Sequence, residues 1–388
     1  MKKLSIVLLA LLLIGGMAFA AELSGDASVS FGYDLDAQTY GFTNATTQDL
    51  TLVLSEGLGE TKGEGAIYAE ITGSFDLTYD STIGGGIATE LVPTFSIDSA
   101  TINGSNWSVD ILGAAGAPDF AASEIDLYGA DDDKESYEIP FDKAAGIAVT
   151  YDDFTVGLGL EGNLGATPTT NTTSLSVVTP AYEVADGVTV QAGGAFSTLN
   201  GDNKMGGSVE VVVADMSGLA LTVAADMGYD AAFNADVAIA AAYADYTLDA
   251  YYNTDATTNF GVKNLLSIKA VAPVDLLTVT FTGKDLVNAQ DLNLEGEVAV
   301  NDALSVSANG GYVVGTKAWN AGGDVTYTQA DYVAKAGASY DDTKTLGLNA
   351  SVESTAIISG ATLSLGYEGT DVTGADKGAV TAKVNIAL

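Results

Sequence analysis

The residues of this chain that could carry chemistry are almost all carboxylates. The 388 residues include 51 Asp and Glu against 14 basic residues, all of them Lys, and there is no His, Cys or Arg. A Ser-His-Asp triad, a thiol nucleophile and an imidazole metal site are therefore excluded. Paired carboxylates can act as acid and base, but among so many acids the spacing selects no pair. We expect no enzymatic activity, no catalytic residue and no cofactor.

The densest group of charged residues lies within a segment from Ala115 to Glu138 that also contains Pro118. This acidic cluster consists of Asp131, Asp132, Asp133, Lys134 and Glu135. Three interpretations are open: a solvated surface loop, a group that sets the charge of a water-filled passage, and a calcium site. The spacing of an EF-hand loop is absent, and we expect no metal site.

The elements that must position these acids alternate between apolar and polar residues with a period of two. The alternation puts Phe, Val, Leu, Ala and Tyr on one face and mostly Thr, Ser, Gly, Asn and acids on the other. Clear examples are Phe154–Glu161, Val188–Gly194, Tyr246–Tyr252 and Leu304–Asn309. Two-faced segments of about ten residues are what a tilted membrane-crossing β-strand requires. The sequence therefore predicts an all-β fold.

Aspartates recur between these segments at intervals of 27 to 33 residues. An interval of about 30 residues fits one hairpin, with two strands, one tight turn and one longer loop. Solenoid repeats have similar periods, but they share residues at fixed positions, whereas here only the alternation and the turn chemistry recur. We therefore expect barrel hairpins, with tight turns at Asp153, Asp186, Asp215, Asp245, Asp275, Asp302 and Asp331.

Between Leu23 and Leu388 we count about 22 candidate strands. The prediction is a transmembrane antiparallel β-barrel with an even number of strands, about 18–22, which forms one domain over residues 21–388. The strand Gly378–Leu388 ends the chain and is expected to close the barrel and to be recognised by the barrel assembly machinery. Its apolar face consists of Val380, Ala382, Val384, Ile386 and Leu388.

The first 20 residues have the pattern of a signal peptide. Lys2 and Lys3 precede the apolar run Leu4–Ile14, and Ala18-Phe19-Ala20 has the small-x-small form of a cleavage site. The run is too short for a transmembrane helix, which needs about 20 apolar residues. We predict cleavage after Ala20, export, and a location in the lipid of a bacterial outer membrane.

Net charge narrows the function. The chain carries −37, which disfavours nucleic acid as a partner, and acidic pore linings favour cations. We expect a porin: a water-filled, cation-preferring diffusion channel for small hydrophilic solutes. By the strand count, Ala115–Glu138 is the third surface loop, and the acidic cluster is a candidate constriction or selectivity element if that loop enters the lumen.

One segment carries a family resemblance. Tyr40–Phe42 reads YGF, Thr46 and Thr47 follow, and Gly63–Ile71 reads GEGAIYAEI. The segment Tyr40 to Ile71 resembles the N-terminal region of the spirochaete major outer sheath proteins and the treponemal repeat family (Msp/Tpr). The resemblance implies an outer-membrane location, porin activity and, for some members, adhesion to host matrix proteins.

Two further functions stay open from the sequence. The first is a surface adhesin in which the barrel only displays loops that bind host matrix proteins. The second is a soluble exported β-repeat protein, which would have no barrel in a membrane.

Overall fold

The structure is a computed structural model, and it describes residues 20–55, 67–80, 92–111, 116–123, 125, 138–163, 170–256, 262–358, 360–374 and 376–387. These residues form 23 strands of a single antiparallel sheet. No helix long and apolar enough to cross a membrane occurs among them. The strands are β1 Ala20–Asp34, β2 Thr39–Ser55, β3 Tyr68–Asp80, β4 Val92–Asn103, β5 Trp107–Asp110, β6 Gly146–Tyr151, β7 Phe154–Asn163, β8 Thr170–Val178, β9 Tyr182–Ala185, β10 Val188–Leu199, β11 Asp202–Met216, β12 Leu219–Asp230, β13 Ala232–Tyr243, β14 Tyr246–Ala256, β15 Val262–Val274, β16 Leu277–Lys284, β17 Asp291–Asn301, β18 Leu304–Val313, β19 Ala318–Gln329, β20 Tyr332–Asp341, β21 Leu346–Ser354, β22 Ala361–Gly369 and β23 Ala379–Ala387.

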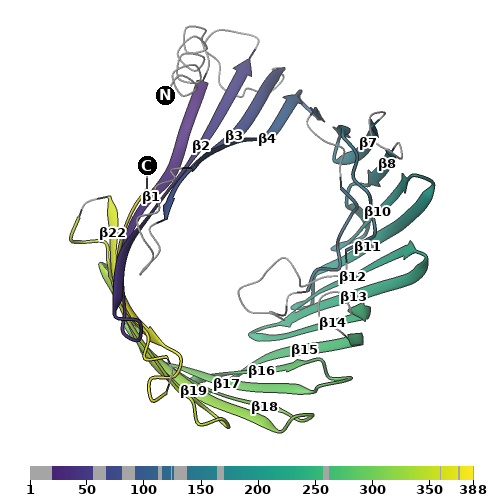
Figure 1. Cartoon of the computed structure of the whole chain (residues 1–388). Helices are drawn as coiled ribbons and strands as arrows, with labels where there is room; N and C mark the ends of the chain where they lie inside the picture. The colour runs from purple at the N-terminus through teal and green to yellow at the C-terminus, as the bar shows by residue number, and fades with distance from the viewer. Residues whose placement is uncertain are drawn as a thin grey trace, which may run out of the picture.

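The strand pairings run in a ring whose shortest link is β5, with three residue pairs to β4 and four to β6. Strands that follow one another in the sequence pair as antiparallel neighbours, and β23 returns to pair with β1 from Asp34↔Ala379 to Asp26↔Ala387. Both β8 and β9 pair with β10, so they are two pieces of one wall strand. The 23 strands therefore occupy 22 places in the ring, and Figure 1 shows them arranged around a central space. The predicted antiparallel barrel with an even number of strands is confirmed.

The break between β8 and β9 has a local cause. Pro180 follows Thr179 at this point, and proline cannot donate a ladder hydrogen bond. Thr179 maintains the hydrogen bonding to β10 at this point. Its backbone N–H donates to Ala192 O at 2.8 Å and its Oγ1 accepts the Ala192 N–H at 3.0 Å. The wall strand thus continues past the proline.

The two faces of the wall differ as the alternation predicts. Val211 on β11 pairs with Val190 on one side and Val223 on the other, and Val223 pairs with Ile239. One residue along, the opposite face carries Glu210 and its cross-strand neighbours. Large apolar side chains are exposed around the whole wall. The outward face is therefore apolar, and the inward face carries the polar residues.

Aromatic residues on the outward face gather at both ends of the barrel. One group lies at the end where β1 begins and β23 finishes, here called the terminal end: Tyr151, Tyr243, Tyr246 and Tyr332. The other lies at the opposite end, the loop end: Tyr229, Phe233, Tyr312, Trp319 and Tyr340. Tyr332 and Tyr340 are eight residues apart on β20, about 27 Å along the strand. This spacing fits aromatic girdles that flank an apolar band.

Six of the seven predicted aspartates lie in tight turns at the terminal end. Asp153 and Asp275 adopt positive φ, of 65° and 60°, a conformation that Asp tolerates better than most residues. Asp215 differs, because it lies inside β11. Its Oδ1 accepts the backbone N–H of Gly218 at 2.7 Å and so holds the turn that follows.

Candidate functional site

The connection between β5 and β6, residues 111–145, lies against the inner wall wherever the structure describes it after residue 111. Its described parts, 116–123, 125 and 138–145, contain no strand, and these parts lie inside the ring beside β10 and β11 (Figure 1). The backbone N–H of Phe120 donates to Ser208 Oγ at 3.1 Å and that of Ala121 donates to Asp226 Oδ2 at 3.2 Å. Ser208 and Asp226 face inward, so this first part is held to β11 and β12.

The second described part of the connection is held in the same way. The backbone N–H of Asp142 donates to Ser197 Oγ at 2.8 Å, and that of Ala144 donates to Ser174 Oγ at 3.3 Å. Both serines are fully buried. Since buried N–H groups need acceptors, these inward serines stabilise a connection that has no ladder of its own.

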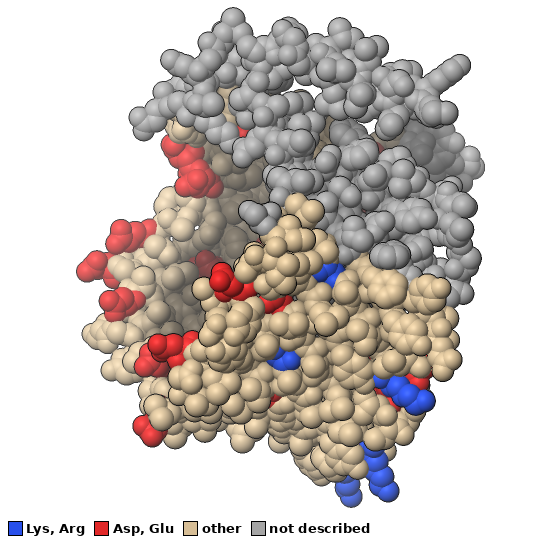
Figure 2. All heavy atoms as spheres, turned by 90° about the vertical axis from the view of Figure 1, so that its left-hand side faces the viewer, with Lys and Arg blue, Asp and Glu red and all other residues tan. Residues whose placement is uncertain are grey.

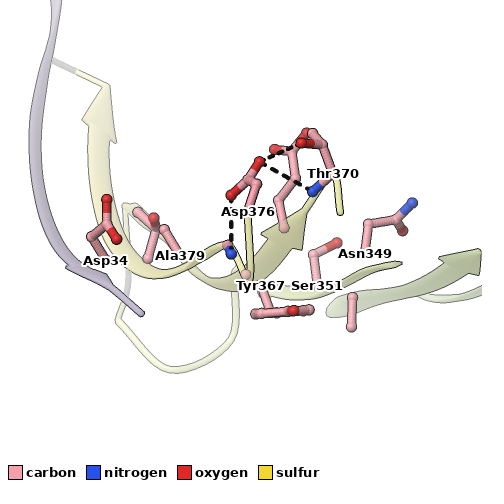
Figure 3. A pocket seen from close by; sticks show the side chains of 12 residues that line it. Asp34, Asn349, Ser351, Tyr367, Thr370, Asp376 and Ala379 are labelled. Carbon is pink, nitrogen blue, oxygen red and sulfur yellow. Dashed lines mark hydrogen bonds between the residues drawn. The ribbon is translucent and has the colours of Figure 1, made fainter. Parts of the chain in front are cut away.

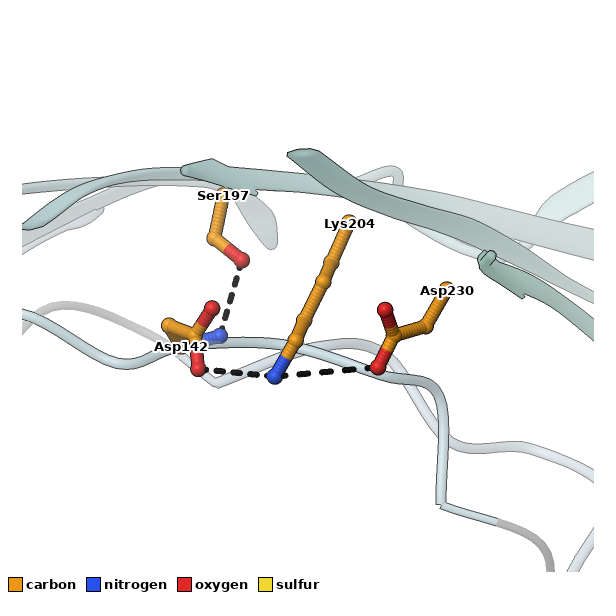
Figure 4. Close-up of polar contacts among 4 residues, drawn as sticks. All are labelled: Asp142, Ser197, Lys204 and Asp230. Atoms are coloured by element: carbon orange, nitrogen blue, oxygen red, sulfur yellow. Dashed lines mark hydrogen bonds and ion pairs between the residues drawn. The ribbon is translucent and has the colours of Figure 1, made fainter. Parts of the chain in front are cut away.

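An ion pair adds a charged contact between the connection 111–145 and the wall. Lys204 on β11 reaches Asp142 Oδ1 at 2.9 Å and Asp230 Oδ2 at 3.9 Å (Figure 4). The Lys204 and Asp142 side chains keep 25% and 18% of their exposure, so solvent still screens the pair. The ion pair fixes position more than it adds stability.

Inward glycines make room for the connection. A Cβ on Gly193 would lie 2.6 Å from Pro118 Cβ, and a Cβ on Gly206 would lie 2.2 Å from Ile139 Cγ2. On the outward side, a Cβ on Gly194 would meet nothing closer than 3.7 Å. Close approach of the connection therefore explains Gly193, whereas strand packing or bending would be the expectation from a wall glycine alone.

These contacts bear on the interpretations of the Ala115–Glu138 segment. Its parts 116–123, 125 and 138 belong to a connection that lies on the inner wall, between the fifth and sixth places of the ring, as the third connection at the loop end. The acidic cluster itself, residues 131–135, lies outside the described residues. Over the part of the chain that is described, no group of three or more acids could hold a metal ion.

The predicted closing strand, Gly378–Leu388, contains β23, Ala379–Ala387. The side chains of Val380, Ala382, Val384 and Ile386 share the outward face of β23, which pairs with β22 and β1. Leu388 lies outside the described residues. The junction between β23 and β1 is here called the seam. Turn contacts add to it: Leu35 N–H donates to Gly378 O at 2.9 Å and Lys377 N–H donates to Asp36 Oδ2 at 2.5 Å.

Beside the seam, at the loop end, the inner wall is hollowed by a polar cavity of about 570 Å³. Three carboxylates line it, those of Asp34, Glu368 and Asp376. Figure 3 shows Asp376 between Thr370 and the backbone N–H of Gly378, which it accepts at 3.1 Å. The hydroxyl and backbone N–H of Thr370 hold the pKa of Asp376 below its ordinary value of 3.8. This carboxylate therefore stays charged in mild acid.

Every charged side chain at a position of β10–β23 that pairs with a neighbouring strand faces inward. The lysines among them are Lys204, Lys263, Lys269, Lys284, Lys335 and Lys383. The acids are Asp202, Glu210, Asp226, Asp230, Asp236, Asp249, Asp255, Asp291, Glu295, Glu297, Asp324, Asp341, Glu353 and Glu368. Seen from the seam side, most of the described surface is uncharged and acids gather toward one edge (Figure 2). The lumen is thus lined by an excess of negative charge.

The wall residues that accept hydrogen bonds from the connection were not singled out from the sequence. A signal for them exists: inward positions on consecutive strands carry small residues, with Gly159 on β7, Ser174 on β8, Ser197 on β10 and Ser208 on β11. Small inward side chains on adjacent strands leave space that another segment can fill. What the alternation does not indicate is which segment fills it.

Comparison with known proteins gives structural likenesses alone. No protein-family model and no curated protein matches the chain. Similar solved structures include a mutant of the Rh. blastica porin, with 11% identity over 95% of this chain and 100% of that chain and a TM-score of 0.37. Another is the translocation pore of the P pilus usher, with 9% identity over 95% and 99% of the two chains and a TM-score of 0.44. A third, from work on asymmetric conductivity of engineered proteins, has 11% identity over 95% and 100% and a TM-score of 0.37.

Proposed function

We propose that this chain is a porin-like protein of a bacterial outer membrane, through which small hydrophilic solutes diffuse and in which cations pass more readily than anions. The observation that carries the proposal is the inward excess of carboxylates over lysines in a barrel whose outward face is apolar. A barrel satisfies every backbone group internally, and its apolar face can therefore meet lipid.

Cation preference follows from where the acids lie. Carboxylates on a wall of low dielectric focus a negative potential into the water between them, which raises the local concentration of cations. The Debye length falls from about 10 Å at 0.1 M salt to about 3 Å at 1 M. The preference should therefore weaken as salt rises.

The connection 111–145 contributes by narrowing the lumen. Its described parts lie on the inner wall of β7–β12, and in the sequence the acidic cluster falls between these parts. We propose that Asp131, Asp132, Asp133 and Glu135 add to the negative potential along the solute path.

Export and assembly complete the proposal. Residues 1–20 would direct export with cleavage after Ala20, and the assembly machinery would recognise β23 through the apolar face that it shares with β22 and β1. The resemblance of Tyr40–Ile71 to the spirochaete outer sheath family, with binding to host matrix proteins, stays a prediction.

The test is a planar bilayer recording on refolded protein in a potassium chloride gradient. We expect a reversal potential of the sign set by cations, which shrinks between 0.1 M and 1 M salt because screening grows. Replacing the four acids of the cluster by Asn and Gln should lower the preference further, whereas Asp153→Asn in a turn at the terminal end should leave it unchanged. A reversal potential of the opposite sign would overturn the mechanism.

A further inference from the structure

One part of the inward wall is apolar rather than polar. Near the terminal end, inward positions of three neighbouring strands carry Val212 and Ala214 on β11, Ala220 on β12, and Ala240 and Ala242 on β13. With Thr222, Thr247 and Asp249 these side chains line a shallow hollow of about 340 Å³. Its lining is far more apolar than that of the seam cavity, which holds three carboxylates.

The register of the strands explains the hollow. One cross-strand row runs Val212↔Thr222↔Ala240↔Asp249, and the next runs Ala220↔Ala242↔Thr247. Alanine side chains at the centre of both rows are shorter than the groups around them. A depression of the wall results, with a carboxylate on its β14 side.

The charges around the hollow are mostly negative. Asp249 belongs to its lining, and Glu210 is the next inward residue of β11 after Val212 toward the loop end. Lys269 on β15 pairs across from Asp249, so one cation also lies at this edge. A solute that fits must bring an apolar body to the alanines and a positive group to the carboxylates.

We propose that this hollow is a binding site for small amphipathic cations, such as primary alkylammonium ions, inside the lumen. The inference rests on the proposed function, because the solute reaches the hollow through a water-filled, cation-enriched lumen. The alkyl chain lies on Ala220, Ala240 and Ala242, and the ammonium group lies toward Asp249. Bound ions of this kind obstruct the current of smaller cations.

The apolar contact sets a quantitative expectation. Full burial of one methylene group improves binding roughly fourfold, and an open hollow that covers one side of the chain should give roughly twofold. The concentration that halves the potassium current should therefore fall about twofold per added methylene from butyl- to hexyl- to octylammonium. A hydrophilic monocation of similar length, 2-(2-hydroxyethoxy)ethylammonium, lacks the apolar chain and should block less than hexylammonium.

The experiment measures half-blocking concentrations in planar bilayers for the unmodified chain and three variants. Ala240→Asn places a polar group in the hollow and should remove the dependence on chain length. Asp249→Asn should weaken block by all the monoammonium ions to a similar degree. The matched control is Ala299→Asn, which is also inward and lies on β17, away from the hollow, and should leave block unchanged.

The outcomes separate this inference from the function on which it rests. Block that does not depend on chain length, or that survives Ala240→Asn, overturns the amphipathic site even when the channel still prefers cations. A channel that conducts anions better than cations overturns the proposed function, and the site then has no cation-enriched lumen in front of it.

Discussion

Ser197 on β10 and Ser351 on β21 both face the lumen, but they have different surroundings. Ser197 is fully buried and accepts a hydrogen bond from the connection 111–145. Ser351 is exposed and lines the cavity beside the seam. They represent two sectors: the covered sector, which is the part of the inward face of β7–β12 that the connection 111–145 contacts, and the seam sector, the inward face of β21–β23 and β1.

The difference teaches that one wall pattern serves two purposes. In the covered sector, polar inward residues act as acceptors for a segment without ladder hydrogen bonds, and glycines give it room. In the seam sector the same kinds of residue meet the open lumen, where carboxylates such as Glu368 contribute to the potential that solutes experience. Substitutions of matched residues in the two sectors should therefore have different effects.

The largest expected effect comes from adding bulk to an inward glycine. Gly193→Leu forces a side chain into Pro118 of the connection, because even a Cβ would lie 2.6 Å away. We expect either a loss of about 1–3 kcal/mol of unfolding free energy or release of the connection with a larger single-channel conductance. Denaturant unfolding in detergent and bilayer recordings measure the two.

The control for this prediction is Gly366→Leu in the seam sector, where a Cβ meets nothing closer than 3.9 Å. That substitution should leave stability nearly unchanged and should slightly lower the conductance. Equal effects of the two leucines would show that the covered sector is no more crowded than the seam sector.

A smaller effect is expected from removing a buried acceptor. Ser197→Ala leaves the backbone N–H of Asp142 without its partner at 2.8 Å, which should cost about 1 kcal/mol. Limited proteolysis within residues 115–138 should become faster, because the connection is held less firmly. Ser351→Ala should change stability by less than about 0.5 kcal/mol, and a matching loss there would contradict the distinction between the sectors.

The smallest expected effect is a pH response at the loop end of the seam. A carboxyl whose pKa is lowered in the folded state contributes stability above its ordinary pKa, and the contribution is lost as pH falls through the lowered value. For Asp376 that window lies below pH 3.8. Thr370→Val removes the hydroxyl donor, so the pKa of Asp376 should rise toward its ordinary value in a carbon NMR titration. An unchanged titration would remove Thr370 as the cause.

The sequence by itself determined which residues face outward, where most of the aspartate turns fall and roughly how many wall strands there are. Alternation with a period of two and the aspartate spacing are local properties, so Phe154–Glu161 and Leu304–Asn309 could be read directly as parts of β7 and β18. The segment 115–138 was equally readable as an interruption of the strands.

Only the tertiary structure decided which inward residues hold another segment. Ala121 and Asp226 are 105 residues apart in the chain, and no local pattern relates them. Ring closure likewise joins Asp34 to Ala379 across nearly the whole chain. The physical reason is that side-chain periodicity fixes the direction in which a residue points, whereas its neighbour depends on how the barrel curves and where the long connection returns to the wall.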